Sequence, residues 1–431
     1  MSIPSYFPAQ NPLPSYWLKD PHPLASFRSS DNVPPQCDIA IIGTGLAGVA
    51  TAYHILSDPS LASKPNVVLL EARQACTGAT GRNGGHLKLA TWIGRNTSVK
   101  HGKAAVAEVI KNQLDQIAAL KEVVEKENID CEFHVTRSFD IFFDEGHAQE
   151  MQGFVLAHQS ETWSQHIHWV DASELAKITG IRNSKGAFSV PAASLWPYKL
   201  VTALLSRVLE LGGTLYTETY VTKVEESDNQ TILTTSRGVL NAHKTIFATN
   251  AYTAALLPQY EGIITPFKGQ NSHLSPSPSF HPEMILDNTY NLHFNKRYAD
   301  YLNPRPDHTI ILGGAKWTYE DILDRAQWWN TTDDTTLIND AATEHFDTVM
   351  ADHFHGWEGA KAHHDFVWTG IMGETPDALP HVGKVPGMTM IFTTARAVAR
   401  MVVHGVTYED TDLPSVFRST AERLAVKNPG F

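Results

Sequence analysis

The chain has 431 residues, of which 42% are hydrophobic and 19% charged, so it is long and apolar enough for two or more domains and is neither disordered nor fibrous. Its formal net charge of -12, without a long run of lysine or arginine, argues against nucleic acid as a partner and favours small neutral or cationic ligands. The three cysteines, Cys37, Cys76 and Cys131, are odd in number and lack CxxC spacing, which argues against a disulfide framework and a thiolate zinc site. We therefore expect a reducing, cytoplasmic location.

Residues 1–36 are expected to form an extended arm, because prolines are frequent there. The start MSIPSYFPAQ lacks the basic residues and apolar run of a secretory signal. The longest apolar stretch, residues 39–56, is interrupted by glycines and by the polar Thr51 and His54. A strand followed by a helix explains this stretch better than a membrane span, so no membrane association is expected.

Residues 38–73 have the pattern of one βαβ unit. A continuous apolar run at 38–42 predicts a buried strand, apolar residues at helical spacing predict a helix after Gly45, and a second apolar run at 66–73 predicts a parallel neighbour strand. The intervening GTGLAG has the GxGxxG spacing of a dinucleotide-binding turn. The plain alternative is an ordinary glycine-rich turn.

Each glycine of GTGLAG has a physical reason in a dinucleotide site. Gly43 permits the tight turn, Gly45 lets backbone N–H groups approach a pyrophosphate at the helix N-terminus, and Gly48 lets the helix pack on the strand. Glu71 ends the next strand, where a carboxylate holds both ribose hydroxyls and repels a 2′-phosphate, so NADP is disfavoured. The residues expected to contact the dinucleotide here are Gly43, Gly45, Leu46, Ala47, Gly48, Glu71, Ala72 and Arg73.

CTGATGRNGGHLK, residues 76–88, contains four glycines within eight positions. A glycine costs roughly 0.5–1 kcal/mol relative to alanine in regular structure, so this density indicates a backbone conformation or a close approach that side chains would block. We expect a bound molecule to lie against this glycine loop. The plain alternative is a flexible surface loop.

The remaining chain alternates between helical and strand patterns. The helices are expected at 103–127 and 197–213, and the strands at 132–145, 214–226, 231–236 and 239–252. From 263 to about 314, turn-rich β segments predict a second, sheet-based domain. The chain closes with an expected strand at 388–392 and a helix at 393–405.

Several segments together resemble a known family. They are EARQACTGATGRNGG at 71–85, TYVTKV at 219–224, FATNAY at 247–252 and WTGIMGETPDALPHVG at 368–383. In order and spacing they resemble the D-amino-acid oxidase-like superfamily of FAD-dependent oxidoreductases, over nearly the whole chain from residue 38. GRNGG is similar to its gamma-glutamylputrescine oxidase-like branch. The resemblance implies FAD as the cofactor.

The resemblance also implies an α/β fold with two domains: an FAD/NAD(P)-binding Rossmann-like domain and a mainly antiparallel β-sheet substrate domain. The FAD-binding domain is expected to comprise residues 37–128, 185–260 and 356–431. The substrate-binding domain is expected to comprise residues 129–184 and 261–355.

In such proteins the glycine loop runs beneath the isoalloxazine ring. The resemblance therefore implies that Gly81, Gly84 and Gly85 leave room for the ring, that Asn83 and backbone N–H groups address its edges, and that Arg82 favours reduced flavin or faces phosphate. Val221 would contact the adenine through its backbone, with its side chain in the core. The full set of further expected cofactor contacts is Thr80, Gly81, Arg82, Asn83, Gly84, Gly85, Val221, Thr249, Gly370, Met372 and Thr393.

Three departures from the family pattern refine the expectation. Gly370 stands where the sarcosine-oxidase branch has a cysteine joined to the flavin, so FAD is expected to be noncovalent at this point. Met372 stands where glycine-oxidase relatives place an arginine that clamps a carboxylate, which disfavours a simple α-amino acid substrate. The glycine-rich loop that resembles GFxGHGM before the last helix is missing, and Thr393 and Thr394 are left to cap that helix and present N–H groups to the ring.

Candidates for catalysis are His86, directly after the glycine loop, and Tyr301 and Lys316 on the expected substrate domain. Arg305 and Trp317 are further candidates for the cavity wall. A structural hydrogen bond is the plain alternative for His86, and a place on the sheet surface for the others. The histidine-rich HFHGWEGAKAHHDF at 353–366 is interpreted as surface histidines, so no metal site is expected.

The function that follows is an FAD-dependent oxidoreductase that oxidises the C–N bond of an amine or an amino-acid-derived substrate by hydride transfer to flavin, with O2 as the acceptor giving H2O2. No side chain is required as an obligatory base. The alternative is a noncatalytic or impaired flavin-binding protein that lacks the C-terminal flavin loop. An aromatic hydroxylase using FAD and NADPH is disfavoured, because no Gly-Asp stretch precedes the last helix. The amine, the acceptor and the oligomeric state are not fixed by the sequence.

Overall fold

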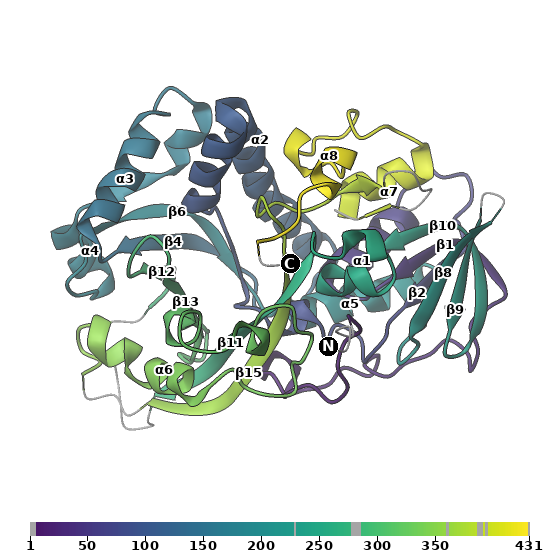
Figure 1. Ribbon diagram of the computed structural model, residues 1–431, viewed down its shortest axis with the longest axis horizontal. Coiled ribbons are helices and arrows are strands. Elements are labelled where there is room, and N and C mark those ends of the chain that lie inside the picture. The colour runs from purple at the N-terminus through teal and green to yellow at the C-terminus, as the bar shows by residue number, and fades with distance from the viewer. Residues whose placement is uncertain are drawn as a thin grey trace.

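Two large sheets organise the molecule in the computed structural model, which describes residues 6–227, 230–276, 286–358, 362–385, 391–392 and 395–429. Sheet A lies on the right in Figure 1 and sheet B on the left, with helices around both. The three cysteines are buried and unpaired, as the sequence predicts. Within the described ranges, no helix is long and apolar enough to cross a membrane.

Sheet A has the strand order β16-β17-β10-β1-β2-β7, with β9 paired to β10 and β8 to β9. The neighbours β17, β10, β1, β2 and β7 run parallel, as in a Rossmann-like sheet, whereas β8, β9 and β10 form an antiparallel meander. The bounds are β1 Gln36–Ile42, β2 Val67–Leu70, β7 Thr214–Tyr216, β8 Val221–Ser227, β9 Gln230–Thr235, β10 Gly238–Phe247, β16 Gly383–Lys384 and β17 Ile391–Phe392.

Both faces of β1 are buried, which explains its continuous apolar sequence. Ile39 and Ile41 pack into the core formed with the helices, and Ala40 and Ile42 pack into the core on the opposite face. The helices on the first face are α1 Leu46–Leu56, α5 Pro197–Glu210 and α7 Ala395–His404. The predicted βαβ unit is therefore present, with its glycine turn at the carboxyl end of β1.

Sheet B has the strand order β15-β11-β14-β13-β12-β4-β6-β3, with β5 paired to β6. Only β12 and β4 pair in parallel among its described strands, so the sheet is mainly antiparallel, as predicted. The bounds are β3 His86–Lys88, β4 His134–Phe142, β5 His168–Val170, β6 Gly186–Ser194, β11 Thr265–Pro276, β12 Thr289–His293, β13 Ala299–Pro304, β14 Ile310–Gly314 and β15 Ala362–Glu374.

The two faces of sheet B differ in chemistry. One face is apolar and is covered by α6 (Asp340–His353), whose Phe346 and Val349 pack with Leu292, Leu302 and Leu312. The other face is polar across adjacent strands. Its row of register partners is Asp140, Asn291, Tyr301, Gly313 and Asn271.

Other helices cover the outer end of sheet B. α2 spans Thr91–Lys126, starts well before the predicted residue 103, and passes through Gly102 at a φ of 81°. α3 (Glu145–Leu156) and α4 (Ala172–Thr179) also lie at this end, whereas the short C-terminal α8 (Ala421–Leu424) packs its Leu424 against the core of sheet A.

The strand pairing bears on the proposed domain division. That division places 185–260 and 356–431 with the FAD-binding sheet, yet β6 and β15 pair within sheet B. These two strands lie at points where the chain passes between the sheets, and the sequence has no composition change there. The division into domains remains a proposal, with β6 and β15 better grouped with the second sheet.

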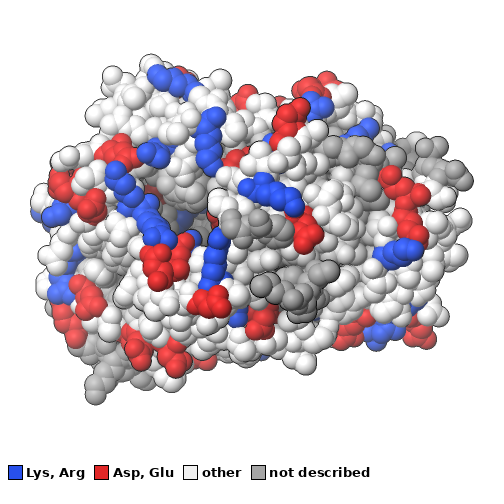
Figure 2. Space-filling view, viewed as in Figure 1, with Lys and Arg blue, Asp and Glu red and all other residues white. Residues whose placement is uncertain are grey.

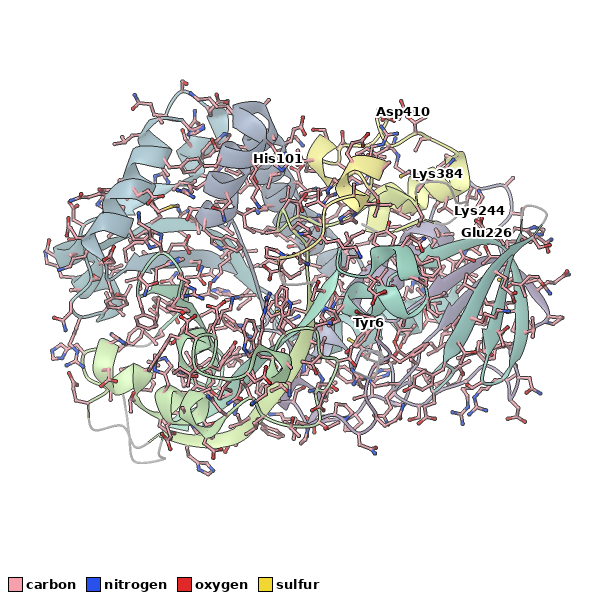
Figure 3. All side chains as sticks on the ribbon, in the orientation of Figure 1. Tyr6, His101, Glu226, Lys244, Lys384 and Asp410 are labelled. Carbon is pink, nitrogen blue, oxygen red and sulfur yellow. The ribbon has the colours of Figure 1, made fainter. Side chains whose placement is uncertain are left out.

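The N-terminal segment is not a free arm. Tyr16 and Trp17 lie in a short 3₁₀ helix, η1 (Tyr16–Leu18), and both side chains are buried. Tyr6 lies near the middle of the molecule in Figure 3 and donates to Glu261 at 3.4 Å. The segment therefore packs across the body of the protein.

Candidate functional site

One large cavity of about 2090 Å³ runs from the α1 turn to the polar face of sheet B. Its walls include the α1 turn, the glycine loop, the end of β2, the start of β8 and parts of β11, β13 and β15. Figure 2 shows a hollow in the half of the molecule that carries sheet B, with basic and acidic side chains around it. A single continuous space thus joins the predicted dinucleotide turn to the second sheet.

The α1 turn has the geometry of an anion site. Leu46 N–H donates to the Thr80 hydroxyl at 3.1 Å, whereas the N–H groups of Gly45 and Ala47 have no acceptor within the described residues. Gly45 and Ala47 both line the cavity. Free N–H groups at a helix N-terminus bind phosphate oxygens, so this turn fits the pyrophosphate of FAD.

The carboxylate of Glu71 lies beside this turn. It accepts from the N–H and the hydroxyl of Thr44 at 3.0 and 2.7 Å, and from the N–H of Arg73 at 3.0 Å. These bonds hold it at the carboxyl end of β2 and on the cavity wall. Thr44, which the sequence analysis missed, orients the carboxylate for the predicted ribose contact.

Steric contacts explain the first glycine motif. A Cβ on Gly43 would lie 2.5 Å from the Ala248 carbonyl oxygen, and a Cβ on Gly48 would lie 2.0 Å from the Gly43 carbonyl oxygen. A Cβ on Gly45 would lie 3.0 Å from the Thr80 hydroxyl. The tight turn and the close helix–strand packing are both possible only because these positions have no side chain, as the motif predicts.

The glycine loop has its carbonyl groups bonded to the protein. Five consecutive carbonyl oxygens, from Gly81 to Gly85, accept hydrogen bonds from the side chains of Ser15, Asn271, Trp368, Trp17 and Asn303. The N–H groups of Asn83 and Gly84, which line the cavity, have no acceptor within the described ranges. A flavin ring, which has acceptor atoms along its edge, fits these free donors.

Two of the loop glycines have a different reason from the one predicted. A Cβ on Gly85 would lie 2.6 Å from the Trp17 ring, and a Cβ on Gly81 would lie 2.3 Å from the Cys76 carbonyl oxygen. Neither glycine lines the cavity, whereas Gly84 does and packs against Tyr301. Close approach of the protein itself therefore accounts for Gly81 and Gly85.

The Asn83 side chain folds back on its own loop. Its amide donates to the Thr80 carbonyl at 3.1 Å, and its oxygen accepts from the N–H of Gly85 at 2.8 Å. The backbone of Asn83 is thus the part that is free for a ligand, in contrast to the side-chain contact that was predicted.

Arg82 is committed to protein partners rather than to a ligand. Its guanidinium donates to the carbonyls of Thr77, Thr369 and Leu13 at 3.0, 2.8 and 2.6 Å, and lies 3.6 Å from Asp334. Burial lowers its pKa to about 10. Each nitrogen of the guanidinium thus donates to a protein carbonyl, and a contact of Arg82 with flavin or phosphate stays a prediction.

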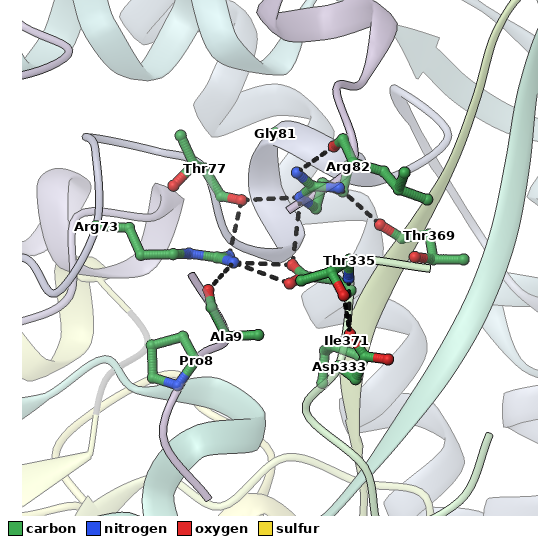
Figure 4. A network of polar contacts seen from close by, with 12 residues as sticks. Pro8, Ala9, Arg73, Thr77, Gly81, Arg82, Asp333, Thr335, Thr369 and Ile371 are labelled. Atoms are coloured by element: carbon green, nitrogen blue, oxygen red, sulfur yellow. Dashed lines mark hydrogen bonds and ion pairs between the residues drawn. The ribbon is translucent and has the colours of Figure 1, made fainter. Parts of the chain in front are cut away.

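Arg73 joins the same network, drawn in Figure 4. It donates to both oxygens of Asp334 at 3.0 and 2.9 Å and to the carbonyls of Ala9 and Thr77 at 3.2 and 3.0 Å. Asp334 is fully buried, so two guanidinium groups compensate one buried carboxylate. Nothing in the TTDDTTL sequence around Asp334 indicated this pairing.

The structure brings together two of the three predicted catalytic residues. The rings of His86 and Tyr301 lie 5.4 Å apart between centroids, and both line the cavity. Burial holds the pKa of His86 well below its usual value and raises the pKa of Tyr301, so both are uncharged near neutral pH. The Tyr301 hydroxyl donates to Asn271. His86 Nδ1 is buried without a partner in the described part of the chain.

The other candidates lie differently. Lys316 lines the cavity but pairs with Glu320 at 2.9 Å. Arg305 is buried away from the cavity, where it pairs with Glu132 and lies over the Trp17 ring. Trp317 is exposed and contacts the His345 ring instead of the cavity. Arg305 and Trp317 therefore do not line the cavity, in contrast to the prediction.

Sequence reasoning missed a second set of polar groups next to His86. Lys88 Nζ donates to Asn291 Oδ1 at 2.5 Å, the Asn291 amide donates to Asp140 at 2.6 Å, and Thr91 donates to the other oxygen of Asp140 at 2.7 Å. Burial lowers the pKa of Lys88 to about 7. Strand alternation gave a partial signal, because His86 and Lys88 lie on one face of β3.

The remaining predicted contacts lie around the same cavity. Val221 lines it and buries its side chain in a core, as expected. Thr249, Gly370 and Met372 also line it, and Met372 is 40% exposed. Thr393 lies outside the described residues.

The histidine-rich segment lies elsewhere. His363 and His364 at the start of β15 contact the carboxylates of Asp365 and Asp347. Within the described ranges, no three His, Cys, Asp or Glu residues are arranged to hold a metal.

Comparison with known proteins agrees with this site. The family described as FAD dependent oxidoreductase matches residues 38–404. A probable oxidoreductase, OrdL, of Rhizobium meliloti is 23% identical over 295 residues, covering 65% of this chain and 64% of that protein. Gamma-glutamylputrescine oxidoreductase of Escherichia coli is 23% identical over 246 residues, covering 55% of this chain and 54% of that protein. The matched segments span less than two thirds of each relative.

Solved structures show the same fold. Glycine oxidase from Geobacillus kaustophilus superposes with a TM-score of 0.69 and 17% identity, covering 90% of this chain and 99% of that one. L-proline dehydrogenase from P. horikoshii gives a TM-score of 0.68 and 17% identity, covering 87% and 96%. The two-domain architecture is thereby confirmed, and the family match confirms FAD as the cofactor. The cavity geometry and these matches together place the chain in the FAD dependent oxidoreductase (DAO) family.

Proposed function

We propose that this protein oxidises the C–N bond of an amine that carries no α-carboxylate, with O2 as the final acceptor. FAD supplies the hydride acceptor when bound. Amine, oxygen and water would then give a carbonyl product, the released amine or ammonia, and H2O2. The observation that carries the proposal is that, among the residues the structure describes, no free cation lines the sheet B side of the cavity around Met372.

The cations on this side of the described cavity already have partners. Arg73 and Arg82 share Asp334, and Lys316 pairs with Glu320. A carboxylate in this space would be desolvated without a guanidinium to compensate it, which is costly. Two residues beyond Met372, the Glu374 carboxylate lines the cavity and bonds to no described residue. An acidic group at this place favours a cationic substrate over an anionic one.

The neighbouring wall suits a neutral amine nitrogen. His86 and Tyr301 are uncharged and hydrogen-bonding, and they lie beside the glycine loop. A low-dielectric wall of this kind disfavours the ammonium form, which has no lone pair to assist hydride loss. In this proposal His86 and Tyr301 orient the amine and exclude water, and neither acts as an obligatory base.

The test is anaerobic mixing of the FAD-loaded protein with secondary amines and polyamine derivatives, with glycine as the α-amino acid control. Bleaching of the flavin band by an amine, with H2O2 formed on readmission of air, supports the proposal. Bleaching by glycine at a comparable rate would overturn it.

A variant pair sharpens this test. Met372→Arg supplies the missing cation, and Met372→Leu keeps the side chain apolar. We expect Met372→Arg to raise kcat/KM for glycine relative to the best amine by about tenfold, the size of one charge-assisted contact. Met372→Leu should leave the ratio unchanged.

One observation favours the alternative of a flavin-binding protein with impaired catalysis. β17 ends at Phe392 and α7 begins at Ala395, so only two residues connect them. In this alternative, so short a connection replaces the longer family loop that the resemblance implies. Protein that binds FAD yet is bleached by no amine would support this alternative, and protein that stays colourless with added FAD would contradict it.

A further inference from the structure

The N-terminal segment from Tyr6 to Leu18, here called the arm, lies outside the part of the chain that matches the family. It nevertheless contacts the cavity at two separate places. Phe7 and Pro8 line the cavity near Val221, and Ser15 and Trp17 bond to the glycine loop. We propose that the arm is an integral part of the FAD site, which sets the peptide orientation of the glycine loop and covers the Val221 end of the cavity.

The first step of the argument concerns the peptide between Asn83 and Gly84. Trp17 Nε1 donates to the Asn83 carbonyl at 2.6 Å, and the Trp17 side chain is fully buried. In a trans peptide the C=O and N–H groups point in opposite directions, and the described chain has no cis peptide. The Trp17 bond therefore turns the Gly84 N–H away from the arm.

A second contact supports this orientation. The Ser15 hydroxyl donates to the Gly81 carbonyl at 2.6 Å, and Ser15 is also fully buried. The missing side chain of Gly85 leaves room for the Trp17 ring, since a Cβ there would lie 2.6 Å from it. The surfaces of the glycine loop and the arm are thus complementary in shape.

The arm is fastened between its two ends by buried charges. Ala9 O accepts from Arg73, and Leu13 O accepts from Arg82, so both guanidinium groups of the Asp334 network hold arm carbonyls. Leu13 N–H donates to the Asp334 carbonyl at 2.8 Å. Figure 4 shows the side chains of Arg73 and Arg82 directed toward the same carboxylate, with Pro8 and Ala9 of the arm next to Arg73. These bonds make the arm a fixed part of the wall.

The far end of the arm covers the place where the family resemblance puts the adenine. The Phe7 ring meets the Tyr220 ring at 6.4 Å in an edge-to-face arrangement, and the Tyr220 hydroxyl donates to Pro8 O at 3.5 Å. Phe7, Tyr220 and Val221 all line the cavity. An apolar aromatic cover suits the flat, weakly polar adenine ring. This inference rests on FAD binding and not on the proposed amine chemistry.

The test compares two tryptophan variants. Trp17→Phe keeps the ring and removes the donor to Asn83 O, whereas Trp163→Phe removes a buried indole N–H that has no partner in the described residues. FAD-depleted protein is titrated with FAD, and Kd is measured from the quenching of FAD fluorescence. We expect Trp17→Phe to raise Kd about tenfold and Trp163→Phe to change it less than about twofold. Equal Kd values for the two variants would overturn the proposal.

A second measurement decides the case if Trp17→Phe does not fold. Hydrogen exchange of residues 6–18 is followed in the unaltered protein, with and without FAD. Slower exchange in the arm on binding FAD supports the proposal, and unchanged exchange overturns it. Neither readout depends on amine turnover, so a protein that binds FAD through the arm and oxidises no amine would refute only the proposed function.

Discussion

Two glycine-rich segments face the same cavity, and their glycines are required for different reasons. In the α1 turn, a Cβ on Gly43 or Gly48 would meet a backbone carbonyl, that of Ala248 or that of Gly43. In the glycine loop, the clashes involve Trp17 from the arm and Tyr301 from sheet B. The first segment is confined by backbone, and it fits phosphate through the N–H groups that its own helix leaves free. The second is a junction where three parts of the chain meet, so its conformation depends on all of them.

The N–H groups of the two segments are also free for different reasons. A helix N-terminus carries its free N–H groups wherever it forms. The N–H groups of Asn83 and Gly84 are free only because side chains from elsewhere hold the adjacent carbonyls. Substitutions in the two segments should therefore differ in how far their effects can be relieved by changes elsewhere.

The largest effect is expected for Gly48→Ala. Its Cβ would lie 2.0 Å from the Gly43 carbonyl oxygen, and backbone cannot move aside as a side chain can. We expect a loss of about 3 kcal/mol or more in the free energy of unfolding of the FAD-free protein. Denaturant unfolding measures the loss, and a variant as stable as the parent would contradict the local account of this segment.

Gly84→Ala should cost less and should be relieved from a distance. Its Cβ would lie 2.5 Å from the edge of the Tyr301 ring. We expect a loss of about 2 kcal/mol for Gly84→Ala, and a coupling of about 1–2 kcal/mol in a double-mutant cycle with Tyr301→Ala. Additive losses would mean that the ring does not limit the space at this glycine.

Low pH should lower the free energy of unfolding through protonation of His273. The centroid of its ring lies 3.8 Å from that of Tyr16 in the arm, and the two rings are stacked. Burial lowers the pKa of His273 to about 4, below its ordinary value of 6.5. Between these pH values the unfolded chain binds a proton that the folded chain does not. The stabilisation from this group is therefore complete above about pH 6.5 and is lost as the pH falls toward 4.

The measurement for His273 is the slope of unfolding free energy against pH in this interval. His273→Gln should reduce the slope by up to about 1.4 kcal/mol per pH unit. His101→Gln, at an exposed site on α2 labelled in Figure 3, is the control and should leave the slope unchanged. Equal slopes for all three proteins would show that His273 titrates in the fold as it does in water.

Gly78→Ala should have the smallest effect. No atom lies within 4 Å of a Cβ at this position, and the φ of -76° suits alanine. We expect a change within about 0.5 kcal/mol in the stability of the FAD-free protein. A large loss here would show that the loop needs glycine for reasons other than the contacts described.

The sequence was sufficient for features that depend on local pattern. The apolar runs of β1 and β2, the helical spacing of α1 and the GxGxxG turn each follow from residues close together in the chain, and the structure has them where they were predicted. The prediction that His86 and Tyr301 line the cavity depended on the family resemblance and not on a local pattern. Their ring contact joins two strands far apart in the chain.

The sequence was insufficient where side chains meet across long separations. Arg73 and Asp334 are 261 residues apart, and Trp17 and Asn83 are 66 apart. Neither pair belongs to a repeating pattern, so nothing in the spacing distinguishes Asp334 from the acidic residue beside it. The sequence did not reveal the partners of Arg82 for the same reason, because two of its three carbonyl acceptors, Leu13 and Thr369, are far from it in the chain.

The Asp334 network has a consequence for how the protein is made. The arm leaves the ribosome long before Asp334, whose carboxylate holds Arg73 and Arg82. Until then the nascent chain has two guanidinium groups with no buried counter-ion, and the entropy of closing so long a loop opposes docking. The glycine loop thus gains its contacts with the Asp334 network only after most of sheet B has been synthesised, and we expect FAD to bind late in maturation.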